Sequence, residues 1–201
     1  MTTSLLLFNR WDTTQVAVTD PGLKNYINLS PKIIPRTNGL FTSRPVSKVK
    51  ATIVERFVNK LMVPGHRGKK HKITSGRCTA SNQAILLAVR EAFDLIEKRT
   101  KKNPVQVLVQ AIENAALYEE IAAYRLGGII ARQAVVVSPY RRLDLALRHI
   151  TQGIYGASFR SKKSLAAAIA DELIAGAAND AQRSVGVRER QRLEKEAEGA
   201  R

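Results

Sequence analysis

The side chains with the clearest chemical implication are pairs of lysine or arginine that recur where helices are expected to begin. Arg141 and Arg142 follow Ser138 and Pro139, which are typical of an N-cap and a first helical position. A helix N-terminus carries partial positive charge, so cations there are disfavoured unless an anion binds. A phosphate suits such a position, because free backbone N–H groups and arginine both face it.

Two further expected helix starts show the same pattern. We predict one helix over residues 47–63 and another that begins just after residue 161. Their opening turns carry Lys48 and Lys50 behind Ser47, and Lys162 and Lys163 behind Ser161. A single pair is explained by ordinary solvation of charged side chains. Three departures from the same local rule favour phosphate binding instead, because such departures concentrate at functional sites.

A loop over residues 64–77 concentrates more positive charge. Its candidate RNA-binding cations are Arg67, Lys69, Lys70, Lys72 and Arg77, and Arg148 and Arg160 are further candidates downstream. A charge run of this kind is also compatible with a solvated loop. The net charge of +16 suits a polyanionic partner. No apolar run approaches the roughly 20 residues that span a bilayer, so no membrane partner is expected.

The sequence lacks the residue patterns of an enzyme. No nucleophile motif, phosphate-loop fingerprint or paired-carboxylate arrangement is present, and Gly127-Gly128 lacks the spacing of a dinucleotide loop. His66 and His71 have no cysteine or carboxylate at ligand spacing. Cys78 is the only cysteine, which excludes an intrachain disulfide. We therefore expect no catalysis, metal, cofactor or small-molecule substrate.

A β-hairpin is predicted over residues 119–138, with Gly127 and Gly128 as its turn. A type I′ turn needs positive φ at both central positions, which glycine adopts without steric cost. With this turn Ala123 pairs with Arg132, and Arg125 and Arg132 project from the same face. We expect this β-arm to present two cations away from the body of the protein.

Apolar residues at three- and four-residue steps predict helices around this arm. The expected ranges are 47–63, 81–99, a helix starting at Asn103-Pro104, 139–152, and one after 161, with a linker over 153–160. Residues 1–45 hold four of the seven prolines and are expected to be extended. The predicted fold is mainly α: a bundle of five to six helices with one protruding antiparallel hairpin. The predicted divisions are an extended N-terminal arm (1–45), a helical RNA-binding domain (46–180), and a charged helical tail (181–201), exposed or frayed.

Cations dispersed over helix starts and a projecting β-arm suit structured RNA, which proteins bind mainly through backbone contacts and shape. Two alternatives stay open. An architectural DNA-binding protein would place an apolar wedge at the arm tip, and Leu126 and Ile129 leave room for that. A protein-interaction scaffold would leave the cations merely solvated.

Several segments resemble the ribosomal protein S seven family of the small ribosomal subunit. They are Phe57-Val58-Asn59-Lys60-Leu61-Met62, Asn103-Pro104-Val105-Gln106-Val107-Leu108 and the run from Arg132 to Arg142, RQAVVVSPYRR. The proline-rich N-terminal segment, with Leu7-Phe8-Asn9-Arg10-Trp11, is similar to the archaeal and eukaryotic branch.

The resemblance implies a structural ribosomal protein that binds the 3′ major domain of small-subunit rRNA and nucleates assembly of the subunit head. It implies that the β-arm, with Arg125, Gly127, Gly128 and Arg132, lies near the exit-site tRNA and the mRNA exit path. The implied surroundings are the cytoplasmic ribosome and neighbouring small-subunit proteins. Reversing the charges of Arg141 and Arg142 together is then expected to weaken RNA binding while leaving helix content unchanged.

Overall fold

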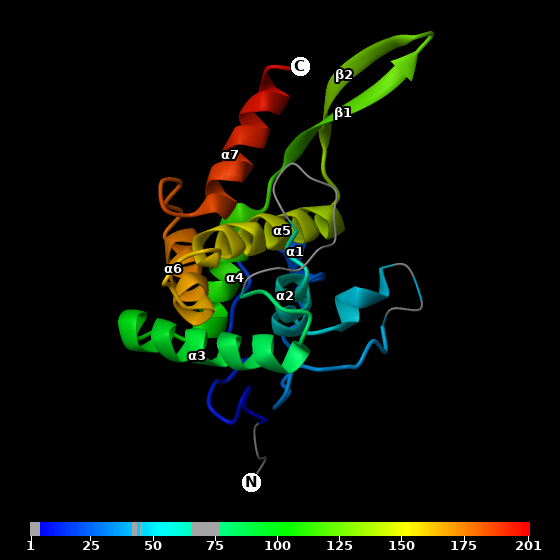
Figure 1. Cartoon of the computed structure of the whole chain (residues 1–201). Coiled ribbons are helices and arrows are strands. Elements are labelled where there is room, and N and C mark those ends of the chain that lie inside the picture. The colour runs from blue at the N-terminus through cyan, green and yellow to red at the C-terminus, as the bar shows by residue number, and fades with distance from the viewer. Residues whose placement is uncertain (1–4, 42–43, 45, 66–76) are drawn as a thin grey trace.

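A helical body and one projecting hairpin make up the computed structural model, which describes residues 5–41, 44, 46–65 and 77–201 (Figure 1). The described elements, in chain order, are α1 (Pro21–Lys24), the 3-10 helix η1 (Ser47–Lys50), α2 (Ile53–Met62), α3 (Asn82–Thr100), α4 (Pro104–Ala115), β1 (Glu119–Leu126), β2 (Ile129–Val136), α5 (Pro139–Ser158), α6 (Leu165–Ala177) and α7 (Val185–Glu198). This architecture confirms the predicted mainly α class. Within the described ranges, no helix is long and apolar enough to cross a membrane.

Local capping chemistry places two of the helix starts where the sequence predicts them. The Ser81 hydroxyl accepts a hydrogen bond from the Ala84 amide at 3.4 Å, and α3 begins at the next residue. The Asn103 side chain accepts from the Val105 amide at 3.0 Å, with Pro104 at the first position of α4. Both caps satisfy amides that would otherwise lack a partner inside the helix.

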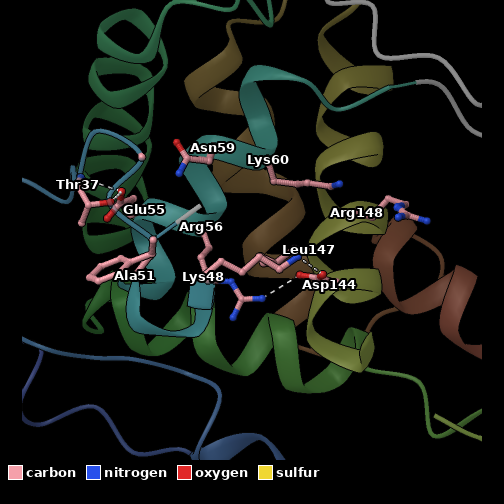
Figure 2. A pocket seen from close by; sticks show the side chains of 12 residues that line it. Thr37, Lys48, Ala51, Glu55, Arg56, Asn59, Lys60, Asp144, Leu147 and Arg148 are labelled. Atoms are coloured by element: carbon pink, nitrogen blue, oxygen red, sulfur yellow. Dashed lines mark hydrogen bonds and ion pairs between the residues drawn. The ribbon is translucent and has the colours of Figure 1, made fainter. Parts of the chain in front are cut away.

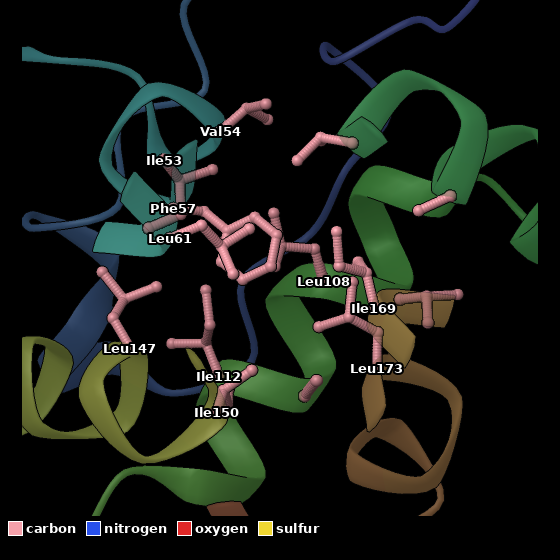
Figure 3. Close-up of a cluster of buried hydrophobic side chains, with 14 of the residues drawn as sticks. Ile53, Val54, Phe57, Leu61, Leu108, Ile112, Leu147, Ile150, Ile169 and Leu173 are labelled. Carbon is pink, nitrogen blue, oxygen red and sulfur yellow. The ribbon is translucent and has the colours of Figure 1, made fainter. Parts of the chain in front are cut away.

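The core forms where the apolar faces of α2–α6 meet (Figure 3). Phe57 of α2 is fully buried and lies centrally, between α4 on one side and α5 on the other. Leu108 and Ile112 extend this contact from α4, and Ile169 and Leu173 extend it from α6. The alanine-rich stripe of α6 allows close approach, because small side chains let helix backbones pack together.

The N-terminal segment is largely without regular structure, as predicted, and it packs on the helices. Trp11 is buried, and its indole N–H donates to Glu97 of α3 at 3.1 Å. The Trp11 ring also meets the Phe93 ring edge-on, with centroids 5.6 Å apart. Further along, the Asn103 side chain donates to the Asp12 carbonyl at 2.6 Å. Several apolar residues of this segment, among them Leu7, Trp11 and Leu23, therefore belong to the main core.

Helix α5 corrects the prediction of a linker over residues 153–160. The helix continues to Ser158, because Gly153 is a packing residue and not a break. A Cβ at Gly153 would lie 2.7 Å from Cβ of Val185 in α7 and 3.1 Å from the Glu172 carboxyl group in α6. The missing side chain lets three helices meet at this point.

The C-terminal tail is helical, as predicted, but it is not an exposed or frayed helix. Val187 and Ala197 of α7 are completely buried, and the helix packs on α5 and β1. Arg201 adds an ion pair to Glu119 at the base of the hairpin. Arg188, Lys195, Glu196 and Glu198 of α7 are exposed, whereas Glu189 is buried together with the short apolar face that holds the helix to the body.

The hairpin matches its predicted register. Ala123 pairs with Arg132, and Leu126 pairs with Ile129. Gly127 and Gly128 adopt φ values of 53° and 95°, as a type I′ turn requires. Strand β2 ends at Val136, two residues before the predicted limit. The arm extends well beyond the helical body (Figure 1).

Candidate nucleic-acid interface

Of the three predicted helix-start pairs, only Arg141 and Arg142 lie in the first turn of an α-helix. Arg141 is exposed, and its guanidinium makes a two-point contact with the Glu120 carboxylate of β1 at 2.6 and 2.9 Å. That hydrogen bond raises the pKa of Arg141 above its ordinary value. The carboxylate of Glu120, rather than an external anion, therefore balances this charge in the free protein.

Arg142 is buried and holds the fold together. Its Nε donates to the Leu117 carbonyl at 3.0 Å, and its second amino group donates to Asp20 at 2.7 Å. The guanidinium also lies 4.2 Å from the centre of the Tyr118 ring. These contacts tie the N-terminal segment and the hairpin base to α5. The guanidinium of Arg142 is thus committed inside the protein, and we leave it out of the RNA-facing surface.

The predicted helix start at Lys48 and Lys50 is wrong. These lysines lie in η1, and α2 begins at Ile53, with Thr52 as its cap. The break arises because Asn28 binds the chain between η1 and α2. Its side-chain amide donates to the Lys50 carbonyl at 2.6 Å, and its backbone carbonyl accepts from the Ile53 amide at 2.9 Å. Both lysines are nevertheless exposed, and Lys48 pairs with Asp144 of α5.

The helix start at Lys162 and Lys163 is also misplaced. Ser164 is the cap, and α6 begins at Leu165, so both lysines precede the helix. Lys162 is exposed, whereas Lys163 pairs with Asp171, which also binds Arg99. Burial alone would raise the pKa of Asp171, but the hydrogen bonds from Lys163 and Arg99 outweigh it and hold that pKa below its ordinary value.

The remaining predicted cations fall into three groups: those with a contact in the structure, those that are exposed, and those outside the described residues. Arg77 donates to the Ser161 carbonyl at 3.2 Å, and Arg160 lies 5.3 Å from the centre of the Phe159 ring. Arg125, Arg132 and Arg148 are exposed. The other predicted contacts, Arg67, Lys69, Lys70 and Lys72, lie outside the described residues.

A hollow of about 370 Å³ between α2, α5 and residues 37–41 brings several of these groups together (Figure 2). Lys48 and Arg56 both reach Asp144, and the Arg56 contact measures 2.9 Å. Lys60 and Arg148 also line the hollow, above Asp144 in this view. Burial, then the neighbouring charge of Arg148, lowers the pKa of Lys60 below its ordinary value. This crowding of positive charge favours an anion at the mouth of the hollow.

The sequence reading missed Lys60, which lines this hollow, and Arg56, which holds Asp144 beside it. Lys60 and Arg56 are four residues apart on one side of α2, which is the spacing of neighbours on a helix surface. That spacing was available in the sequence. The approach of Asp144 and Arg148 from α5 was not, because those residues are more than 80 positions away.

Comparison with known proteins shows which family the chain belongs to. The family model described as ribosomal protein S7p/S5e matches residues 23–201. The small ribosomal subunit protein uS7 of Methanococcus aeolicus is 45% identical over 195 residues, covering 97% of this chain and 98% of that protein. The uS7 proteins of Archaeoglobus fulgidus and Nanoarchaeum equitans are 44% and 43% identical, over 98% and 97% of this chain and 95% and 98% of theirs. The chain therefore belongs to the ribosomal protein S7p/S5e family.

Proposed function

We propose that this protein is a structural, non-catalytic constituent of the small ribosomal subunit and binds the 3′ major domain of its rRNA. The proposal includes nucleation of head assembly and a position for the β-arm near the exit-site tRNA and the mRNA exit path. Its surroundings are the cytoplasmic ribosome, with other small-subunit proteins as neighbours. The full-length similarity to proteins named small ribosomal subunit protein uS7 supports this assignment.

One structural observation carries the rRNA-binding part of the proposal. A subset of the predicted contact cations is exposed and forms no ion pair within the described part of the chain. The members are Lys50, Arg77, Arg125, Arg132, Arg148, Arg160 and Lys162. Other surface cations, such as Arg10 and Arg192, are neutralised by two carboxylates each. Uncompensated cations spread over a body and an arm suit the dispersed phosphates of a folded RNA.

The experiment is binding to a transcript of the rRNA 3′ major domain, with duplex DNA as competitor, at low and moderate salt. We expect preference for the transcript to persist at moderate salt, because specific sites exceed nonspecific ones by about 10³-fold or more. Equal competition by DNA would favour the architectural alternative, in which the exposed Ile129 at the arm tip acts as a wedge. Absence of RNA binding would favour a protein-interaction scaffold.

A matched pair of variants separates the arm from net charge. Arg125→Glu with Arg132→Glu reverses two charges on the hairpin, and Arg90→Glu with Lys98→Glu reverses two exposed charges on α3. We expect the arm variant to lose at least tenfold more affinity for the transcript than the α3 variant. Equal losses would mean that the arm contributes only generic charge.

A further inference from the structure

Glu55, which lines the hollow between α2 and α5, has one buried carboxylate oxygen without a donor in the described part of the chain. Glu55 is 3% exposed, and its Oε1 accepts the Thr37 backbone N–H at 2.8 Å and the Thr37 hydroxyl at 2.5 Å. Its Oε2 is buried and accepts no hydrogen bond from any described residue. A buried acceptor left without a partner costs about 1–3 kcal/mol, so such an oxygen indicates a missing donor.

The walls of the hollow suit a flat, partly apolar ligand. Phe41 contributes an aromatic ring, and Ala51 and Leu147 contribute apolar surface. A nucleobase stacks favourably on an aromatic side chain whatever its sequence. The volume of about 370 Å³ lies at the small end of the range for small-molecule sites and is sufficient for a single nucleotide.

Some of the cations around the hollow are already ion-paired, and others are available to a ligand. Asp144 occupies Lys48 and Arg56, whereas Lys60 and Arg148 form no ion pair in the described ranges (Figure 2). Glu55 and Thr37 lie at the side opposite Arg148. A ligand with a hydrogen-bond donor at one end and a negative charge at the other would match both sides.

We propose that this hollow holds one unstacked nucleotide of the bound RNA, with a base amino group donating to Glu55 Oε2 and the phosphate near Lys60 and Arg148. The inference rests on the proposed RNA-binding function and names a base-reading site within it. Adenine and cytosine carry the required exocyclic amino group, and a carboxylate is its natural acceptor. Uracil has a carbonyl oxygen at the equivalent position, which repels Glu55.

The test is binding of single-stranded RNA hexamers of adenine, cytosine or uracil to the full chain at low salt, followed by fluorescence anisotropy. We expect the adenine and cytosine hexamers to bind about three- to tenfold more tightly than the uracil hexamer, which is the effect of about one net hydrogen bond. Binding that is equal for the three hexamers, or undetectable for all of them, would overturn the inference.

Two variants and a control test the roles of the named groups. Glu55→Gln retains an acceptor for Thr37 and places an amide donor in the Oε2 position, so the preference should shift toward uracil. Phe41→Leu should weaken all three hexamers while leaving their order unchanged. Glu91→Gln removes one exposed carboxylate of α3 and should match the unmodified protein. An unchanged adenine and cytosine preference in Glu55→Gln would remove Glu55 from base reading.

Transcript binding distinguishes failure of this inference from failure of the proposed function. A protein that binds the 3′ major domain transcript tightly but shows no hexamer preference would keep its ribosomal function and lose the nucleotide site. A protein that fails to bind the transcript would lose both.

Discussion

Replacing Arg142 by methionine should destabilise the protein and leave its RNA-facing surface intact. The change keeps most of the side-chain volume while removing the hydrogen bonds to Asp20 and to the Leu117 carbonyl. The ion-paired side chains of Arg142 and Asp20 are only 7% and 15% exposed, so little solvent is available to replace the lost partner. Asp20 would remain as a poorly hydrated carboxylate without its cation.

The expected loss is about 2–4 kcal/mol, taken slightly below the 3–5 kcal/mol of a fully buried pair because Asp20 keeps some solvent contact. For a protein of this size each kcal/mol shifts the melting temperature by about 2–4 °C, so a decrease of roughly 4–16 °C is expected. Urea unfolding followed by circular dichroism measures the free energy, and a thermal scan measures the shift.

Asp20→Asn and the double variant complete a cycle that isolates the pair. We expect the stability losses of the two single variants to sum to clearly more than the loss of the double variant. Once one member of the ion pair has been replaced, replacing the other removes no further interaction between them. Arg141→Met is the matched neighbour, and its half-exposed contact with Glu120 should be worth about 1 kcal/mol or less. A stability loss for Arg142→Met no greater than that for Arg141→Met would refute the structural role of Arg142.

The remaining predictions concern packing, pH and thiol reactivity. Gly153→Ala should destabilise the protein by about 1–3 kcal/mol in urea unfolding, because its Cβ would lie 2.7 Å from Cβ of Val185. Gly156→Ala on the same helix is the control: a Cβ there meets nothing within 4 Å, so this change should not be destabilising. Burial raises the pKa of Glu172, so the folded state binds the proton of this carboxyl group more tightly than the unfolded state does. The unmodified protein should therefore lose stability through this group as pH rises from 4 to 7, and Glu172→Gln should gain stability relative to it over that range. A stability difference that does not change with pH would contradict this prediction. Burial also raises the pKa of the Cys78 thiol to about 11, so a thiol reagent at pH 8 should react with Cys78 only on unfolding, and rapid labelling of the folded protein would be inconsistent with it.

Because Arg141 is exposed and Arg142 is buried, the expected effect of reversing both charges also changes. The sequence alone predicts weaker RNA binding with unchanged helix content. The structure predicts that Arg142→Glu would place a second negative charge beside Asp20 and the Leu117 carbonyl and so destabilise the fold. A test of the RNA-facing role therefore needs Arg141 changed alone.

Local chemistry made much of the fold predictable. The caps at Ser81 and Asn103, the Gly127-Gly128 turn and the pairing of Ala123 with Arg132 all depend on residues that are near in sequence. The prediction of a linker beginning at Gly153 failed because a glycine that lets a distant helix approach has the same local appearance as a glycine that ends a helix.

The sequence by itself determined the mainly α class, the hairpin and its register, the excess of positive charge and the family. Periodicity and turn chemistry depend on residues near one another in sequence, and composition is a property of the whole chain. All three can therefore be read without knowledge of tertiary contacts. The tertiary structure alone decided which cations are neutralised, since Asp20, Glu120, Asp144 and Asp171 reach Arg142, Arg141, Lys48 and Arg99 from distant segments. It also decided that Glu55, Lys60 and Arg148 surround one hollow, because that proximity arises only when α2 packs beside α5.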